Sequence, residues 1–317
     1  LTAQLPWRDI SIIRAYAKYL QQIGSRFSQV YIEKTLPNYA GIAKNLIALF
    51  LSKFDPKEKM AQKNIDAINK KIQEQLDAVT SLDDDRILRH FWHAIKASIR
   101  TNFFQLDANK KPKTYLSFKI NCNEIPELPL PKPLYEIFVY SPRFEGIHLR
   151  CASVSRGGIR WSERREDFRT EILGLMKAQK VKNAVIVPSG AKGGFVLKSL
   201  PPQADRATIQ NEVVTCYKAF IHGLLDLTDN YLANGKIVHP VNTICYDGED
   251  PYLVVAADKG TATFSDIANS ISKEYNFWLG DAFASGGSAG YDHKKMGITA
   301  RGAWESVKRH FREIDIK

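Results

Sequence analysis

The sequence predicts an α/β protein in which a helical region precedes a mixed sheet flanked by helices. In residues 1–112 the apolar side chains recur at helical spacing, about every third or fourth position. From residue 113 on, short apolar runs alternate with amphipathic segments, as strands and helices do in α/β domains. The runs 184–187 and 252–257 are continuously apolar, which is typical of strands covered on both faces. We therefore expect a helical region over 1–112 and an α/β domain over 113–317.

Local signals place the helices of the first region. The apolar positions of 7–22 share one helical face, and Gly24 follows them as a natural C-terminal stop. Ser81, followed by aspartates at 83–85, is a typical helix start. We expect helices over 7–22, over a segment that ends near Leu36 before Pro37, and over 39–54, 57–79 and 86–104.

The second region alternates between strand and helix signals. The runs 135–140 and 147–151 are rich in strand-forming residues, and the turn-like segment 141–146 between them suits a strand pair. We expect strands over 115–120, 135–140, 147–151, 184–187 and 252–257, and helices over 165–179, 207–231 and 264–275.

Composition restricts the class of protein. Hydrophobic residues make up 44% of the chain and charged residues 25%, which fits an ordinary soluble globular protein. No apolar stretch approaches the roughly 18 residues of a membrane span, so we expect no membrane partner. The 4 cysteines form no Cys-x-x-Cys pair, which argues against a metal site and for reduced thiols in a cytoplasmic protein.

The net charge of +11 has two explanations, a nucleic-acid footprint or a binding site for small anions. Lys and Arg are spread along the whole chain, and no RRM, KH or zinc-finger pattern organises them. We therefore expect a small anionic ligand and no nucleic acid. Nucleic-acid binding stays open as an alternative, and a steep salt dependence of DNA binding would support it.

Three segments near the expected strand ends contain the residues best suited to chemistry. Gly190-Ala-Lys-Gly-Gly194 presents Lys192 between glycines, Asp258 follows the run 252–257, and Arg156 lies in a Gly-Gly segment upstream. Ligands of α/β sheets bind at strand ends, and glycines let the backbone approach a ligand closely. Taken singly, each has an ordinary explanation: a solvated loop lysine, a helix cap and a partner for nearby carboxylates. A P-loop is excluded, because Lys192 is followed by glycine rather than by Ser or Thr.

Taken in order, these segments resemble the glutamate, leucine, phenylalanine and valine dehydrogenases. That family carries a Lys-Gly-Gly-hydrophobe-Arg motif, a helix that ends in a lysine, a Gly-Gly-Ala-Lys-Gly-Gly loop and a Pro-Ala-x-Asp strand end. The counterparts here are Arg156-Gly-Gly-Ile-Arg160, Lys182, Gly190-Ala-Lys-Gly-Gly194 and Ala256-Ala-Asp258. The stretches 161–183 and 281–297 resemble the large-subunit NAD-specific glutamate dehydrogenases more specifically, and a weaker likeness extends over parts of 7–20.

The resemblance implies that the chain is the substrate-binding and catalytic segment of an NAD-dependent glutamate dehydrogenase. Such an enzyme converts L-glutamate by oxidative deamination to 2-oxoglutarate and ammonia. Lys192 would be the catalytic lysine, which orients water and stabilises developing negative charge. Asp258 would carry the proton to and from the substrate amine. The opposite charges of Lys192 and Asp258 suit these two roles.

The resemblance also assigns substrate-binding residues. Lys182, with Gln179 on the same helical face, matches the binders of the α-carboxylate. Arg156, in the segment with Gly157 and Gly158, takes the place of the family's lysine, which binds the side-chain carboxylate of glutamate. Arginine in place of lysine exchanges a point charge for a planar fork, which still suits a carboxylate. Two cationic clamps favour glutamate over leucine or valine as the substrate.

NAD is the cofactor that the family uses, and we expect its main binding site outside this chain. Thr299 matches the family's threonine near the nicotinamide amide, although the sequence here is Thr-Ala-Arg-Gly instead of Thr-Gly-x-Gly. No Gly-x-Gly-x-x-Gly pattern occurs, so we expect the dinucleotide domain after residue 317 and expect 1–317 alone to be inactive. The full-length enzyme is expected to be a homo-oligomer.

A non-catalytic module that binds amino acids or anions on the same fold is the alternative from another class. The presence of both Lys192 and Asp258 argues against it, because binding alone requires neither a proton carrier nor a residue that orients water.

Overall fold

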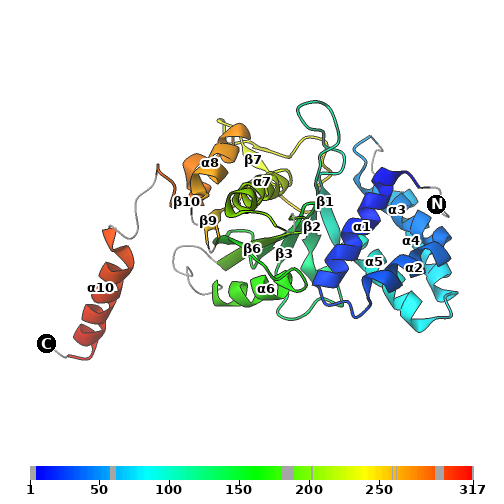
Figure 1. Cartoon of the computed structure of the whole chain (residues 1–317), viewed down its shortest axis with the longest axis horizontal. Helices are drawn as coiled ribbons and strands as arrows, with labels where there is room; N and C mark the ends of the chain where they lie inside the picture. The colour runs from blue at the N-terminus through cyan, green and yellow to red at the C-terminus, as the bar shows by residue number, and fades with distance from the viewer. Residues whose placement is uncertain are drawn as a thin grey trace.

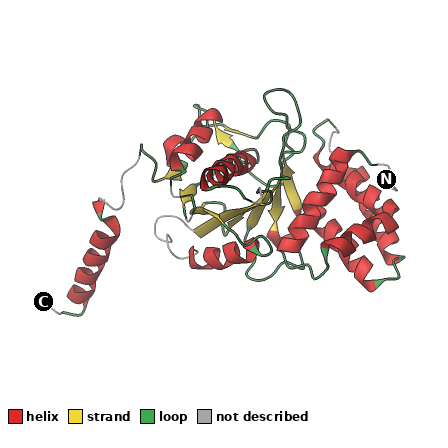
Figure 2. Cartoon of the chain, viewed as in Figure 1, coloured by secondary structure: helices red, strands yellow, loops and turns green. Residues whose placement is uncertain are grey.

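The structure is a computed structural model that describes residues 5–57, 62–179, 189–200, 203–258, 260–261, 263–289 and 296–315. A bundle of N-terminal helices lies at one side of a central twisted sheet (Figure 1). Helix α6 covers one face of the sheet and α7 covers the other, while helix α10 stands apart from the rest of the molecule (Figures 1 and 2). The expected α/β fold with a mixed sheet and a preceding helical region is confirmed.

The first region forms the expected helices, but several of their ends differ from the prediction: the helix expected over 57–79 is described from Gln62 to Asp77, and the one expected from residue 86 begins at Leu82. One helix continues through Pro37 to Asn38; Pro37 lies in its last turn, where proline removes only one main-chain hydrogen bond. The helix expected to reach residue 104 ends at Ala97, because the next residues pair with the sheet as strand β1 (Ser98–Thr101). Ser81 caps that helix as expected, by accepting the main-chain N–H of Asp84. The helices are α1 (Trp7–Gln22), α2 (Gln29–Asn38), α3 (Ala40–Phe54), α4 (Gln62–Asp77) and α5 (Leu82–Ala97).

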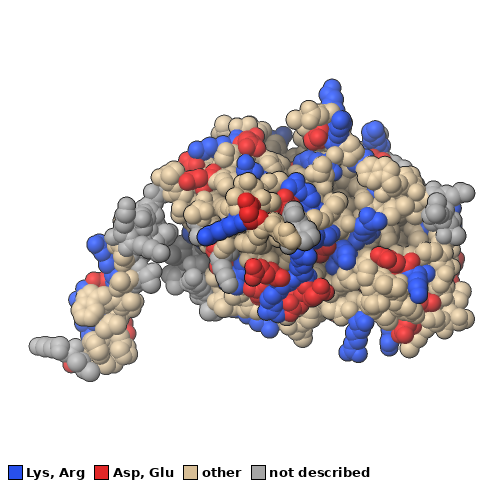
Figure 3. Space-filling view, in the orientation of Figure 1, with Lys and Arg blue, Asp and Glu red and all other residues tan. Residues whose placement is uncertain are grey.

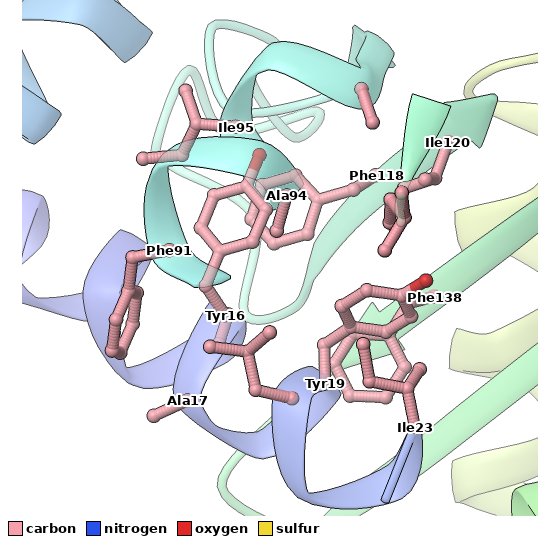
Figure 4. Packing of buried hydrophobic residues seen from close by; sticks show 14 of the residues in the cluster. Tyr16, Ala17, Tyr19, Ile23, Phe91, Ala94, Ile95, Phe118, Ile120 and Phe138 are labelled. Atoms are coloured by element: carbon pink, nitrogen blue, oxygen red, sulfur yellow. The ribbon is translucent and has the colours of Figure 1, made fainter. Parts of the chain in front are cut away.

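The helical region packs directly on the sheet (Figure 4). Tyr16 of α1 stacks on Phe118, with ring centroids 4.3 Å apart, and Tyr19 packs on Phe138. The buried hydroxyl of Tyr19 donates to Glu136 Oε1 (2.7 Å). One hydrophobic core therefore continues from α1–α5 into the sheet, and the division at residues 112 and 113 stays a prediction.

The main sheet has the strand order β1-β2-β3-β4-β6-β5-β9-β10. Neighbours from β1 to β6 run antiparallel, and neighbours from β6 to β10 run parallel. Its further strands are β2 (Leu116–Asn121), β3 (Tyr135–Tyr140), β4 (Phe144–Arg150), β5 (Ser155–Trp161), β6 (Ser189–Leu197), β9 (Val255–Ala257) and β10 (Ala284–Ser285). The covering helices are α6 (Phe168–Gln179), α7 (Arg206–Leu225) and α8 (Ser265–Glu274), and α10 is Ile298–Glu313.

Several expected bounds in the second region were wrong. The strand expected over 184–187 lies outside the described residues, and the glycine-rich segment expected as a loop after it is strand β6. The strand expected from 252 is only Val255–Ala257, and α6 begins at Phe168 rather than at residue 165. In the β3–β4 hairpin, Ser141 donates its main-chain N–H to Phe144 O (2.9 Å), so β4 begins before the expected residue 147.

The helix expected over 207–231 ends at Leu225. After it, Leu227 and Thr228 donate their main-chain N–H groups to the carbonyl oxygens three residues earlier (3.2 and 3.1 Å). The side chain of Asp226 accepts hydrogen bonds from Asn102 Nδ2 (2.9 Å) and the Tyr275 hydroxyl (2.6 Å) and pairs with Lys113. The chain then forms a small hairpin of β7 (Asn230–Tyr231) and β8 (Ile237–Val238).

A buried network of ion pairs holds the segment after α7 against the sheet. Its cations come from β1, β2 and β4, and its aspartates come from 229–250. This network was not predicted from the sequence, because its partners are 100 to 147 positions apart. The pairs are Arg100 with Asp229 (2.7 Å) and Asp247 (2.6 Å), Lys119 with Asp247 and Asp250 (2.6 Å to the latter), and Arg150 with Asp250 (2.6 Å).

His148 of β4 lies beside this network, near the charges of Arg150 and Asp250. Its side chain is buried, and neither ring nitrogen has a hydrogen-bond partner among the described residues. Burial, and then the charge of Arg150, lowers the pKa of His148 to about 3, while Asp250 opposes the shift. Between that value and the unfolded pKa of about 6.5, the unfolded chain binds the proton and the folded chain does not.

We therefore expect acidification from about pH 6.5 to about pH 4.5 to destabilise the fold, by at most about 1.4 kcal/mol per pH unit from His148. The measurement is urea unfolding of the wild-type protein and of His148→Gln across this range. The variant should show a flatter pH dependence whatever its absolute stability. Equal slopes for the two proteins would contradict the assignment.

Candidate active site

The candidate site lies on the face of the sheet that α6 covers. Side chains of a strand alternate between its faces, so Arg156 and Arg160 of β5 share one face. Arg160 Nη1 donates to Glu171 Oε1 of α6 (2.8 Å), which shows that this face is turned towards α6. In β6 a Cβ added at Gly194 would meet an α6 side chain at 2.4 Å, so Lys192, two residues earlier, points to the same side.

Glycines allow the close approach of these elements. A Cβ at Gly157 would lie 1.4 Å from the carbonyl oxygen of Ala191 in the next strand, and a Cβ at Gly190 would lie 2.5 Å from the main chain of Gln179. Gly158 leaves space for Asp258, whose Cβ would be 3.1 Å from an added methyl group. The glycine-rich motif lies within strand β6, and the absence of side chains at its glycines lets the neighbouring strands and α6 pack closely against it. A role of Gly157 and Gly158 in substrate binding stays a prediction.

Lys192 and Asp258 come together although they are 66 positions apart in sequence. Lys192 lies in the middle of β6, where only 4% of the residue is exposed, and Asp258 follows the last residue of β9. The Lys192 amine is paired with Asp258 Oδ2. The main-chain N–H of Asp258 donates to Thr261 Oγ1 (3.2 Å), which in turn donates to Ile159 O (2.6 Å). This turn fixes the carboxylate at the strand end, with about a fifth of its side chain exposed.

Arg160 completes the charge arrangement, and no role was predicted for it. Its Nε lies 3.6 Å from Asp258 Oδ2, while its Nη1 is bound to Glu171. Ser162 Oγ donates to the other oxygen of Glu171 (2.6 Å). Burial would raise the pKa of Glu171, but hydrogen bonds from Ser162 and Arg160 outweigh it and lower that pKa. The only signal in the sequence was the position of Arg160 at the end of the family's glycine motif.

The remaining predicted site residues are placed in part. Arg156 is half-buried in β5 opposite Gly190, and Gln179 ends α6 against the same glycine. These two residues therefore flank the strand that carries Lys192. Lys182 lies outside the described residues. Thr299 belongs to the first turn of α10, and its side chain is not among those described.

Charge is mixed over the visible surface. Lys and Arg are interspersed with Asp and Glu, and no single basic patch dominates this face of the molecule (Figure 3). None of the described helices combines the length and the apolar character needed to cross a membrane.

One group of side chains has the spacing of a metal site. Ligand atoms of Asp229, His239 and Cys245 lie within 4.8 Å of one another, which the sequence spacing did not suggest. Asp229 already accepts two hydrogen bonds from Arg100, and His239 Nδ1 lies 2.8 Å from the same carboxylate. Burial raises the pKa of the Cys245 thiol to about 11, which keeps it protonated. The ion-pair network accounts for this group without a metal.

That the main dinucleotide site lies outside this chain stays a prediction. Such a site needs a glycine-rich turn between a strand and the N-terminus of a helix, which binds the pyrophosphate. The sequence has no Gly-x-Gly-x-x-Gly, and α10 begins after a left-handed Gly297 (φ +60°).

Comparison of the sequence with known proteins finds matches to one family. Residues 71–317 match the model of the bacterial NAD-glutamate dehydrogenase catalytic domain, and residues 1–56 match glutamate dehydrogenase helical motif 3. The chain is 59% identical to an NAD-specific glutamate dehydrogenase of Pseudomonas aeruginosa, over 100% of this chain and 20% of the relative. Proteins of the same name from Halomonas elongata and Mycobacterium tuberculosis are each 56% identical, over 99% and 100% of this chain and 19% and 20% of their own lengths. The chain thus spans about a fifth of each of these relatives.

Proposed function

Since the chain belongs to the bacterial NAD-glutamate dehydrogenase family, we propose that it is the substrate-binding and catalytic segment of an enzyme that deaminates L-glutamate oxidatively to 2-oxoglutarate and ammonia. The observation that carries the proposal is the contact between Lys192 and Asp258 on the face that also holds Arg156 and Arg160. A buried lysine paired with a carboxylate provides the two opposite charges that this chemistry uses at neighbouring atoms.

Lys192 acts on the oxygen that is added to the substrate. After hydride has left the α-carbon, water adds to the resulting iminium carbon and releases one proton to the solvent. The hydroxyl of this carbinolamine releases the second proton when ammonia leaves, and negative charge develops on the oxygen at that stage. A lysine amine held in a buried strand is positioned to donate to that oxygen and to orient the water. Without substrate its charge is compensated by Asp258, which avoids an unpaired buried cation.

Asp258 acts on the nitrogen. It accepts a proton from the substrate ammonium before oxidation, and it returns one to the amine that leaves the tetrahedral intermediate as ammonia. Before it takes up that proton, its negative charge also favours binding of the cationic substrate ammonium. The position directly after β9 and the anchor on Thr261 hold the carboxylate still, which general acid–base catalysis requires.

The substrate carboxylates meet cationic side chains. Arg156 would bind the side-chain carboxylate, while Gln179 and Lys182 would bind the α-carboxylate. Arg156 and Gln179 both lie against Gly190, two residues before Lys192, so these clamps are close to the catalytic lysine. The distance between two such clamps would select a dicarboxylic amino acid over an apolar one.

NAD, which the names of the relatives imply, would be held mainly by other parts of the full-length protein, with Thr299 near its nicotinamide. The basis for this proposal is the missing dinucleotide motif together with the length of the relatives. That the full-length enzyme is a cytoplasmic homo-oligomer stays a prediction.

The test is NADH formation from L-glutamate by the full-length protein, compared with Arg156→Ala. We expect the variant to raise the KM for glutamate about tenfold or more with a much smaller change in kcat, because a clamp is lost and the proton chemistry is not. L-leucine and L-valine should be poor substrates of both proteins. A full-length protein that does not oxidise glutamate, or a variant with unchanged KM, would contradict the respective assignment.

A further inference from the structure

We propose that Arg160 is a positioning residue that holds the Asp258 carboxylate for the proton transfers, and that Glu171 and Ser162 fix the guanidinium in the place from which it acts. This inference rests on the proposed function, because it gives these side chains a task in that reaction.

The sheet register brings Arg160 to Asp258. Strands β5 and β9 are parallel neighbours, with Gly158 opposite Ala256 and Ile159 opposite Ala257. One step further along both strands, Arg160 meets Asp258. Gly158 has no side chain to separate them, and an added Cβ there would lie 3.1 Å from Asp258 Cβ. The contact therefore follows from backbone register and not from a chance meeting of two flexible side chains.

Helix α6 holds the other side of the guanidinium. Arg160 Nη1 donates to Glu171 Oε1 (2.8 Å), and the buried Ser162 donates to Glu171 Oε2 (2.6 Å). Glu171 is thereby bound through both oxygens and cannot turn away from Arg160. An arginine suits this place because its planar fork can face two carboxylates at once, which the single amine of a lysine does less well.

The donor that faces Asp258 is the Nε–H group of Arg160. Arg160 Nε is buried and has no hydrogen-bond partner within the described part of the chain. Asp258 Oδ2 lies 3.6 Å from it, which is an ion pair but too long for a hydrogen bond. Catalytic hydrogen bonds are often long without substrate and tighten in the substrate complex, so this gap fits a contact that closes during the reaction.

Arg160 compensates the charge of Asp258 at the stage of the reaction when Lys192 moves away from it. Lys192 and Arg160 both contact Asp258 Oδ2. When Lys192 turns to the substrate oxygen, it gives up part of its contact with Asp258, whose charge would then be poorly compensated in a mostly buried place. Arg160 remains beside the carboxylate and keeps it ionised and directed at the amine.

The experiment measures kcat and KM for L-glutamate from acidic to alkaline pH in the full-length protein and three variants. In Arg160→Gln we expect kcat to fall about 100-fold, as for a catalytic group displaced by about 1 Å. The KM for glutamate should stay within about threefold, because no substrate clamp is removed. The acidic limb of the kcat profile should move to higher pH by about one unit, since a cation beside Asp258 is lost.

Two further variants separate positioning from a purely structural role. Arg160→Lys keeps the charge and should return the acidic limb to its original place while recovering only part of kcat. The matched control is Arg164→Gln, which removes the same charge from an exposed pair with Asp167 and should leave both constants and the profile unchanged.

The outcomes are distinct. If the unsubstituted protein oxidises glutamate and Arg160→Gln has the same kcat profile, the inference fails and the proposed function stands. A kcat loss with an unmoved acidic limb, or one that Arg160→Lys does not relieve, would also overturn it, as would a large rise in KM. If the unsubstituted protein does not oxidise glutamate, the proposed function fails, and the inference fails with it.

Discussion

Replacing Lys192 by alanine in the full-length protein should abolish glutamate oxidation, lowering kcat by about 1000-fold or more. Lys192 is buried on β6 and faces Asp258, so neither a surface side chain nor a water molecule can easily take its place. The measurement is steady-state NADH formation, combined with calorimetric titration of NAD. NAD affinity should change by less than about twofold, because the main cofactor contacts are proposed to lie elsewhere.

The fold should survive this substitution, because Asp258 keeps Arg160 as a charged neighbour. Lys198→Ala is the matched control: it removes a lysine six positions further along, one that pairs with Glu145 and lies over the Tyr140 ring. Its kcat should remain near that of the unsubstituted enzyme. A Lys192→Ala protein with normal kcat would show that the catalytic assignment is wrong.

Replacing Asp250 by alanine should cause the largest loss of stability among the substitutions considered, about 3–5 kcal/mol. Asp250 is bound by Arg150 and Lys119, and all three side chains are nearly inaccessible to solvent. Burial alone would raise the pKa of Asp250, but the two cations outweigh it and lower that pKa well below its usual value. Without the carboxylate both cations remain buried with fewer partners, which costs more than the intact pair gains.

The measurement is hydrogen exchange of peptides from β2 and β4 in the full-length protein, together with its apparent unfolding temperature. We expect faster exchange in both strands and a fall of about 10 °C. Asp167→Ala, which breaks an exposed pair with Arg164, should change stability by less than about 1 kcal/mol. Equal exchange rates in Asp250→Ala and Asp167→Ala would show that the network does not hold the segment after α7.

The sequence determined the elements whose signals are local. The helix Trp7–Gln22 and the strand Tyr135–Tyr140 have the bounds that their periodicity predicts, because the relevant contacts are between residues a few positions apart. The cap at Ser81 also needs only its own helix. The family motifs placed Lys192 and Asp258 among the candidate site residues, and the register of β5, β6 and β9 explains how these two meet.

Only the tertiary structure decided the features that depend on partners far away in the chain. Gly190–Gly194 has the composition of a loop, yet it belongs to a central strand. Its glycines lie so close to β4, β5 and α6 that larger side chains would not fit at these positions. The end of α5 at Ala97 depends on pairing of the next residues with β2. Arg160 acquires Asp258 as a neighbour across 98 positions, and Arg150 acquires Asp250 across 100. Such pairs depend on strand register and packing, which single residue types and local spacing do not encode.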